Sequence, residues 1–184
     1  MKFCKYQGAG NDFVIADNMD LSIAASDIPA LAADVCDRRF GVGADGFILA
    51  EPSGEADVKM DFYNADGSEA SMCGNGIRCF AKFVTDHSIV KKTEFSVETG
   101  DGVKHIQVLE KTPSVTRVRV DMGTFSDKRN VKSCGFETVS MHLGVPHAVI
   151  FSDAQHNDGA CPKGGMEALD ELACAHGRDL EYSE

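Results

Sequence analysis

The sequence lacks several common features, and each absence excludes a class of protein. No apolar run is long enough to cross a bilayer, which excludes a membrane-spanning helix. The opening residues, MKFCKYQ, contain neither an apolar stretch nor a small-residue cleavage site. They therefore do not form a secretory signal, and we expect a cytoplasmic protein. No internal period recurs along the chain, which excludes solenoids and propellers.

Basic residues are also scarce. Eighteen lysines and arginines stand against 29 acidic residues, which gives a net charge of -11. A chain of this charge repels phosphate backbones, so we expect a small-molecule partner rather than a nucleic acid. The remaining composition, 43% hydrophobic and 26% charged, is ordinary for soluble proteins. With 184 residues the chain is long enough for one large domain or two small ones.

The cysteines show no sign of a disulfide framework or a zinc site. There are seven of them, an odd number at irregular spacings, and no C-x-x-C pair occurs. An odd number excludes complete pairing within one chain, so reduced thiols are the simpler interpretation. The closest pair, Cys73 and Cys79, lacks a second pair at zinc-like spacing, and we expect no metal site.

The apolar pattern predicts mixed secondary structure in the first 122 residues. A helix is expected from Ile28 to about Gly41. A second helix follows Gly76, and its residues 77–84 are so apolar that it must be buried nearly all round, enclosed by strands. Strands are expected at 2–7, 13–16, 47–50, 58–64, 93–98, 103–109 and 115–122. The last three follow one another closely, which predicts antiparallel pairing.

A domain boundary is expected near residues 120–130. Residues 126–132 form a polar stretch, after which new strands are expected at 136–141 and 148–151. A loop at 154–165 and a helix at 166–176 complete the prediction. We therefore divide the chain into domains 1–122 and 123–184. The second has about sixty residues, near the lower limit for an independent core, and we expect it to be incomplete.

Cys73 is the residue with the clearest chemical potential. It stands directly before a glycine-rich turn, Gly74-Asn75-Gly76, that opens the buried helix. A helix N-terminus favours anions, so a thiolate is stabilised there and can serve as a base near neutral pH. The backbone N–H groups of the same turn could grip a substrate carboxylate, because glycine lets a ligand approach closely. Such donors would stabilise the carbanion formed when the α-proton of an amino acid is removed.

Each of these residues also has a purely structural interpretation. A lone cysteine before a helix is most often a small buried hydrophobic residue, and only the flanking glycines and polar turns favour chemistry for Cys73. Cys79 falls within the apolar helix and is assigned to the core, as are Cys4 and Cys36 in their strand and helix patterns.

Three segments resemble the signatures of the diaminopimelate epimerase family, in order and at the expected separations. They are KYQGAGNDF at 5–13, RFGVGADG at 39–46 and the segment from Asn64 to Phe80. Three ordered motifs are more specific than any single glycine-rich loop. The resemblance spans nearly the whole chain and is strongest up to Val84.

The resemblance implies an α+β fold of two related domains, each a curved, mostly antiparallel sheet wrapped around a central helix. It also implies interconversion of the LL and meso forms of diaminopimelate, in lysine and cell-wall precursor synthesis. The family uses neither pyridoxal phosphate nor a metal, so no cofactor is expected. Two cysteines act on opposite faces of the substrate α-carbon, one as a thiolate base and the other as a thiol acid.

The family's functional positions carry over residue by residue. Cys73 matches the first catalytic cysteine, and His147, in the segment GVPH, matches a histidine that modulates the protonation of the thiols. The resemblance implies four further residues that bind substrate: Asn11 and Asn64 through their amides, and Gly74 and Asn75 at the helix N-terminus.

Two departures from the family pattern affect these expectations. Val145 occupies a position where the family commonly has a substrate-binding asparagine. The Gly-x-Gly-Glu-Thr-type turn before the second cysteine is absent, and the segment 176–182 resembles the family segment that precedes it. Cys174 superficially resembles the missing cysteine, but no glycine turn follows it, and packing within a helix is the preferred interpretation.

Three hypotheses for the function therefore remain. The first is diaminopimelate epimerase activity, which the segments around Asp66 and Cys73 favour. The second is a racemase or epimerase of another amino acid on the same fold, for which Val145 leaves room. The third is an inactive fragment or binding module that lacks the second thiol. The sequence leaves open whether the protein forms a homodimer.

Overall fold

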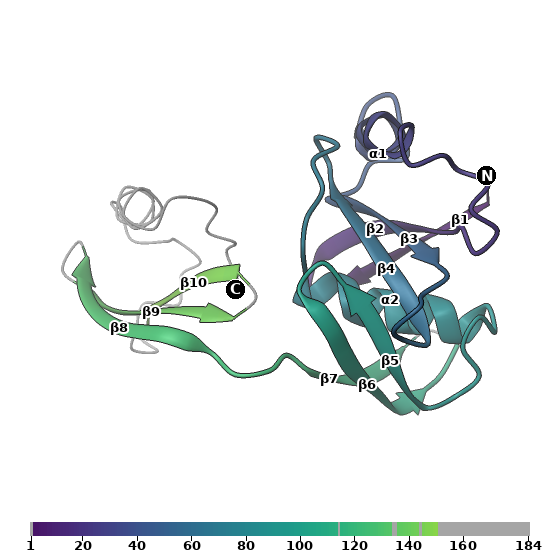
Figure 1. The fold of residues 1–184 in the computed structure, drawn as a ribbon. Helices are drawn as coiled ribbons and strands as arrows, with labels where there is room; N and C mark the ends of the chain where they lie inside the picture. The colour runs from purple at the N-terminus through teal and green to yellow at the C-terminus, as the bar shows by residue number, and fades with distance from the viewer. Residues whose placement is uncertain (1, 114, 134–135, 144, 151–184) are drawn as a thin grey trace. The chain divides into compact units, whose positions relative to one another are not determined.

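The computed structural model describes residues 2–113, 115–133, 136–143 and 145–150 (Figure 1). The chain divides into two units, Met1–Met122 and Gly123–Glu184, and each is considered by itself. Within the described residues, neither helix is long and apolar enough to cross a membrane. The expected loop and helix at 154–176 lie outside the described residues.

A seven-stranded sheet forms the frame of the first unit, with its strands adjacent in chain order. The strands are β1 (Phe3–Gly8), β2 (Asn11–Asp17), β3 (Gly46–Glu51), β4 (Val58–Asn64), β5 (Glu94–Thr99), β6 (Gly102–Lys111) and β7 (Thr116–Asp121). Most neighbours are antiparallel, but β2 runs parallel to β3 and β4 parallel to β5. These two connections carry the helices α1 (Ile28–Cys36) and α2 (Gly74–Asp86), because a parallel pair needs a crossover.

The sheet curves around α2 (Figure 1). This helix contacts the edge strands β1 and β7 as well as β2 and β3, so both edges of the sheet turn toward the same helix. Ile77, Phe80, Ala81 and Val84 of α2 are fully buried in the larger core. The buried helix enclosed by strands, and the mostly antiparallel α+β architecture, are therefore confirmed for this unit.

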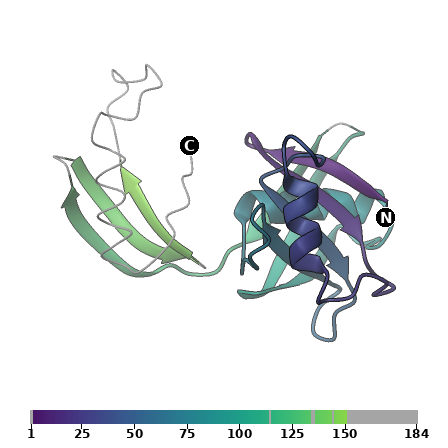
Figure 2. The same cartoon turned by 90° about the horizontal axis from the view of Figure 1, so that it is seen from above.

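The other helix, α1, covers the opposite face of the sheet (Figure 2). On β2, Phe13 and Ile15 belong to the core around α2, whereas Val14 and Ala16 belong to the core beneath α1. Residues that alternate between two buried faces are apolar at every position, which explains the uninterrupted run 13–16. Both cores therefore pack against β2 and β3.

The expected end of the first helix near Gly41 is wrong, because α1 stops at Cys36. Asp37 leaves the helical conformation, and its carboxylate accepts hydrogen bonds from the backbone N–H groups of Arg39 and Phe40, at 2.6 and 2.8 Å. A short polar side chain that bonds to nearby backbone groups competes with a helix in this way. The returning chain then satisfies the last carbonyl groups, since Val42 N–H donates to Val35 at 2.9 Å.

The second unit contributes a three-stranded antiparallel sheet in the order β10-β9-β8. Its strands are β8 (Ser126–Ser133), β9 (Phe136–Leu143) and β10 (Val145–Ile150), so both strands expected after residue 135 are present. The expectation of a plain polar stretch at 126–132 is wrong, because these residues form β8. In the described residues β8 pairs only with β9, and an exposed edge strand needs no apolar alternation.

Candidate active site

The topology brings four chain segments to one end of the sheet in the first unit. The parallel strands β2 and β3 begin there, β4 ends there, and Phe13, Gly46 and Asn64 lie side by side in the strand register. Gly46 has no room for a side chain, since a Cβ atom would lie 2.6 Å from the Phe62 ring. The N-terminus of α2 is tied to the same end through Cys73.

Cys73 caps α2 at its N-terminus. Its backbone is extended (φ -143°, ψ 120°), and Sγ accepts a hydrogen bond from the Gly76 N–H group at 3.3 Å. The residue is 6% exposed, so the thiol is shielded without being sealed off. A Cβ atom on Gly76 would lie 3.3 Å from both Cys73 Cβ and Ile48 Cδ1, so glycine keeps the thiol close to the helix. This geometry suits a stabilised thiolate.

Asn11 lies directly beside this thiol. Its Oδ1 atom accepts from Cys73 Sγ at 3.8 Å, and its Nδ2 group donates to Asp45 Oδ2 at 2.7 Å. The structure therefore brings together Asn11 and Cys73, which are 62 positions apart in the sequence.

Four charged residues that the sequence did not single out form a network beside Asn11, which contacts it through Asp45. Arg38 donates to Asp12 Oδ1 at 2.8 Å and to Asp45 Oδ1 at 2.6 Å, and Lys5 pairs with Asp12 at 2.9 Å. The hydrogen bond from Arg38 holds the pKa of Asp12 well below its usual range, against burial, and Lys5 adds to the effect. Arg38 and Asp45 flank the glycine-rich segment 39–44. This pair of opposite charges is the sequence feature from which their contact could have been predicted.

Asn64 lies at the same end of the sheet but in a different environment. Its side-chain Nδ2 donates to Ser68 Oγ at 3.0 Å, and its backbone N–H donates to the Ser68 carbonyl at 2.8 Å. The turn is closed by Gly67 in the left-handed region (φ +85°), where a Cβ atom would lie 2.4 Å from the Pro29 carbonyl oxygen. Asn64 therefore has a structural role in its turn, whatever it binds.

Gly74 and Asn75 form the first turn of α2. Arg78 donates to the Gly74 carbonyl at 3.0 Å and to the Asn75 side-chain oxygen. These contacts fix the turn from within, while the backbone N–H groups at the start of a helix have no intrahelical acceptor. They can bind an anion that approaches beside Cys73.

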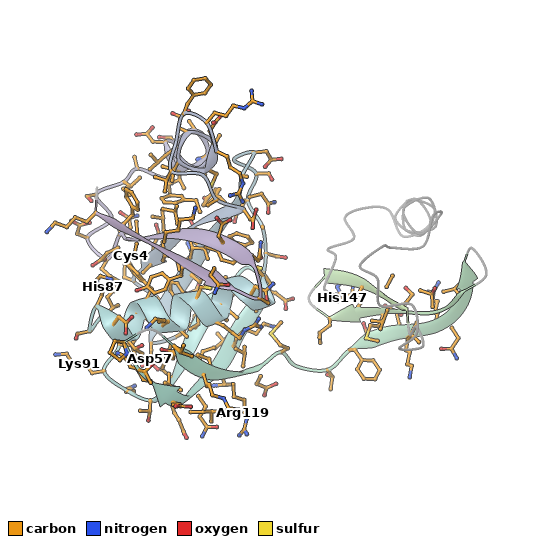
Figure 3. All side chains as sticks on the ribbon, turned by 180° about the vertical axis from the view of Figure 1, so that it is seen from behind. Cys4, Asp57, His87, Lys91, Arg119 and His147 are labelled. Carbon is orange, nitrogen blue, oxygen red and sulfur yellow. The ribbon has the colours of Figure 1, made fainter. Side chains whose placement is uncertain are left out.

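The remaining predicted position is in the second unit. His147 lies on β10, and its Nε2 atom is 3.4 Å from the Leu143 carbonyl oxygen (Figure 3). Its role beside the thiols stays a prediction. The backbone of Val145 is part of β10, but its side chain and the whole of Cys174 lie outside the described residues.

The other described cysteines are free thiols in different surroundings. Cys36 and Cys79 are buried, as predicted, and burial raises the pKa of each to about 11. Cys4 is half-buried at the opposite end of α2, with its Sγ 3.3 Å from Nε2 of His87 (Figure 3). Among these four thiols, Cys73 is the one at the helix N-terminus.

A family model and similar curated proteins all point to the same family. The family model for diaminopimelate epimerase matches residues 3–127. A diaminopimelate epimerase from Agathobacter rectalis is 43% identical over 178 residues, covering 83% of this chain and 61% of the relative. One from Alkaliphilus metalliredigens is 44% identical over 170 residues, covering 83% and 60%. The chain thus spans about three fifths of the length of these curated relatives.

Solved structures share the fold at low sequence identity. A probable proline racemase from Agrobacterium radiobacter K84 aligns with a TM-score of 0.63 at 16% identity, covering 93% of this chain and 59% of that one. A methylitaconate-delta-isomerase aligns with a TM-score of 0.61 at 12% identity, covering 95% and 60%. At these identities the likeness shows the fold alone, and it confirms the expected epimerase-like architecture.

Proposed function

Because the chain belongs to the diaminopimelate epimerase family, we propose that it carries half of a two-base site that interconverts LL- and meso-diaminopimelate without a cofactor. The observation that carries this proposal is the position of Cys73, a thiol held at the N-terminus of α2 with Asn11 beside it. Family membership is the reason for proposing diaminopimelate as the substrate. The support from the structure is that a thiol and the N-terminal turn of a helix lie side by side.

In the first step the Cys73 thiolate removes the α-proton. The Cα–H bond breaks, the S–H bond forms, and the electron pair stays on the α-carbon and its carboxylate. The N–H groups of Gly74 and Asn75, at the start of α2, bind that carboxylate as its charge grows. Donors aimed at developing charge lower the barrier more than they strengthen ground-state binding.

The second step needs an acid on the other face of the carbanion, because return of the proton from Cys73 restores the original configuration. The other described thiols do not fit this role: Cys36 and Cys79 are packed in the two cores, and Cys4 contacts His87. We propose that the second thiol lies outside the described residues. After inversion Cys73 is a thiol and the second cysteine is a thiolate, so a proton returns through solvent from one to the other before the next forward turnover.

The amide side chains orient the substrate in this proposal. Asn11 and Asn64 come from β2 and β4, whose ends meet at the site through Gly46. Amides offer both donors and acceptors, which suits a substrate that carries ammonium and carboxylate groups. His147, on β10, would modulate the protonation of the thiols.

The test is stereochemical. The complete protein is incubated in deuterium oxide with pure LL-diaminopimelate, and α-deuteration and configuration are followed by NMR and chiral chromatography. We expect labelled meso product, and expect it to persist after dialysis against a chelator and treatment with a carbonyl reagent. Absence of α-exchange in wild-type protein, or loss of activity under either treatment, contradicts the proposal.

A second function on the same fold is favoured by one observation. Val145 replaces a family asparagine, so one polar contact to a diamino acid is missing or supplied elsewhere. One structural neighbour is described as a probable proline racemase. A panel of L-amino acids, including proline, hydroxyproline and histidine, measured by polarimetry beside LL-diaminopimelate, decides between the two. Faster turnover of any panel member than of diaminopimelate favours this alternative.

A further inference from the structure

The contacts of the Asn11 amide show which of its two ends faces Cys73. Nδ2 lies 2.7 Å from Asp45 Oδ2, and Oδ1 lies 3.8 Å from Cys73 Sγ. An ionised carboxylate has acceptor atoms only, so the amide atom that faces Asp45 must be the nitrogen. The amide oxygen is then the atom that faces the thiol.

Asp45 is itself held on both of its carboxylate oxygens. Arg38 donates to Oδ1 at 2.6 Å, and the backbone N–H of Asp12 donates to Oδ2 at 3.0 Å. Arg38 is also bound to the Asp12 carboxylate at 2.8 and 3.2 Å. The backbone of Asp45 is fixed as well, because its N–H donates to the Asp12 carbonyl at 2.9 Å. A carboxylate held at so many points sets the orientation of whatever it binds.

We propose that Asp45 is a positioning residue that fixes the orientation of the Asn11 amide between Cys73 and the substrate. With the amide oxygen toward sulfur, Asn11 accepts a hydrogen bond from the protonated thiol. The second N–H of the same amide, which Asp45 does not use, is left to donate to a substrate carboxylate. The part that concerns substrate rests on the proposed function, whereas the part that concerns the thiol does not.

The isosteric variant Asp45→Asn tests the orientation. An asparagine at position 45 can donate to Asn11 Oδ1, so the Asn11 amide can turn and present N–H to Cys73. An N–H donor favours the thiolate, which is the form that iodoacetamide alkylates. We expect Cys73 in Asp45→Asn to be alkylated about 3- to 10-fold faster at neutral pH, the effect of one hydrogen bond. The rate is measured on the Cys73 peptide by mass spectrometry.

Two controls separate positioning from loosening of the fold. Cys79, which is 4% exposed, reports local opening in the same digest, and its alkylation rate should not change. Asp37→Asn is the matched charge control, because Asp37 is exposed and accepts from the N–H groups of Arg39 and Phe40 instead of from Asn11. It should leave the Cys73 rate at the wild-type value.

A double-mutant cycle shows whether Asp45 acts through Asn11. In an Asn11→Ala background, Asp45→Asn should no longer accelerate the alkylation of Cys73, since the amide that transmits the effect is gone. Three results overturn the proposal: equal Cys73 rates in wild type and Asp45→Asn, an undiminished acceleration in the Asn11→Ala background, or a parallel acceleration at Cys79.

Epimerisation provides the second measurement. Asp45→Asn should lower kcat/KM for LL-diaminopimelate about 10-fold while Cys73 becomes more reactive, because the substrate loses one oriented donor. Unchanged kcat/KM alongside the expected alkylation cycle overturns the substrate part of the proposal. If wild-type protein shows no epimerisation, the proposed function fails, and the alkylation cycle still decides the role of Asp45.

Discussion

Helix α2 has a thiol close to each of its ends, and the two thiols have different neighbours. At the N-terminus Cys73 accepts from a backbone N–H group and adjoins two glycines. At the C-terminus Cys4 adjoins His87, the residue that caps the helix there. The ends of a helix carry opposite partial charges, so the first environment favours an anion and the second a cation.

The C-terminal end of α2 is surrounded by charged and phenolic side chains. Asp86 pairs with Lys82 at 2.9 Å and with Lys111 at 3.0 Å, and Tyr6 Oη lies 3.4 Å from the same carboxylate. Burial and the neighbouring Asp86 raise the pKa of Tyr6 above its usual range. At this end two lysines compensate the Asp86 carboxylate, whereas a backbone N–H group bonds to Cys73 at the other end. The comparison teaches that two thiols beside one helix have different electrostatic surroundings, according to the end of the helix at which each lies.

The largest expected effect is from removal of the N-terminal thiol. Cys73→Ser should lower epimerisation by about 100- to 10,000-fold, because a hydroxyl is too weak an acid to supply the base. Cys4→Ser, the matched control at the other end of α2, should change the rate less than twofold. Rates of LL-to-meso conversion in the complete protein provide the measurement. If Cys73→Ser retains the wild-type rate, the comparison between the two ends loses its functional meaning.

A smaller effect is expected from the glycines that hold the thiol. Gly76→Ala places a Cβ atom 3.3 Å from Cys73 Cβ and Ile48 Cδ1, in a fully buried region. We expect a loss of about 1 to 3 kcal/mol in the free energy of unfolding, as for other overpacked cores, and a displaced thiol.

The matched control for Gly76 is Gly74, two residues earlier. A Cβ atom there meets nothing closer than Arg78 Nη1 at 4.0 Å. Gly74→Ala should be neutral or stabilising by up to about 1 kcal/mol, since alanine favours a helix. Urea unfolding of both variants measures the difference. Equal stabilities would show that the tight contact behind Cys73 relaxes freely.

Next in size is an effect of pH at the site end of the sheet. The hydrogen bond from Arg38, with help from Lys5, holds the pKa of Asp12 below its usual range. A carboxyl group whose pKa is lower in the folded state stabilises the fold above its unfolded pKa of about 4, and this stability is lost on acidification. Asp12→Asn should therefore cost about 1 kcal/mol at neutral pH and progressively less below about pH 4. Urea unfolding across this range tests it, and a pH-independent cost contradicts the assignment.

Local sequence patterns were sufficient to predict the elements around α2. The apolar frequency of residues 77–84 required a helix buried on all sides, and the assignment of Cys79 to the core followed from it. The end of α1 at Cys36 could not be predicted in the same way. It depends on the carboxylate of Asp37, which accepts hydrogen bonds from two backbone N–H groups beyond the helix. Strand β8 escaped prediction because, in the described residues, an edge strand with exposed side chains shows no apolar period.

In the candidate site, too, local features could be predicted from the sequence and contacts between distant residues could not. Cys73 could be found because the glycine turn and the apolar helix that give it its chemistry are adjacent in the sequence. The contacts of Asn11 with Asp45, and of Arg38 with Asp12, could not be predicted, because the partners are 34 and 26 positions apart. Their meeting depends on the parallel pairing of β2 with β3, which only the folded chain defines.

The smallest expected effect is at the C-terminal end of α2, where Asp86→Asn repeats the substitution made at Asp12. The pKa of Asp86 is lowered by Lys82 and Lys111 against burial, so its charge stabilises the fold above an unfolded pKa of about 4. The same charge lies at the negative end of the helix, where it opposes the helix dipole. These two contributions nearly cancel for a partly exposed pair, and the variant should differ from wild type by less than about 0.5 kcal/mol. Urea unfolding at low and high salt measures the balance: salt screens both contributions, so the small difference should shrink further. A loss as large as that of Asp12→Asn would show that the two ends of the sheet depend equally on their carboxylates, and that the contrast between the two ends of α2 is limited to the thiols.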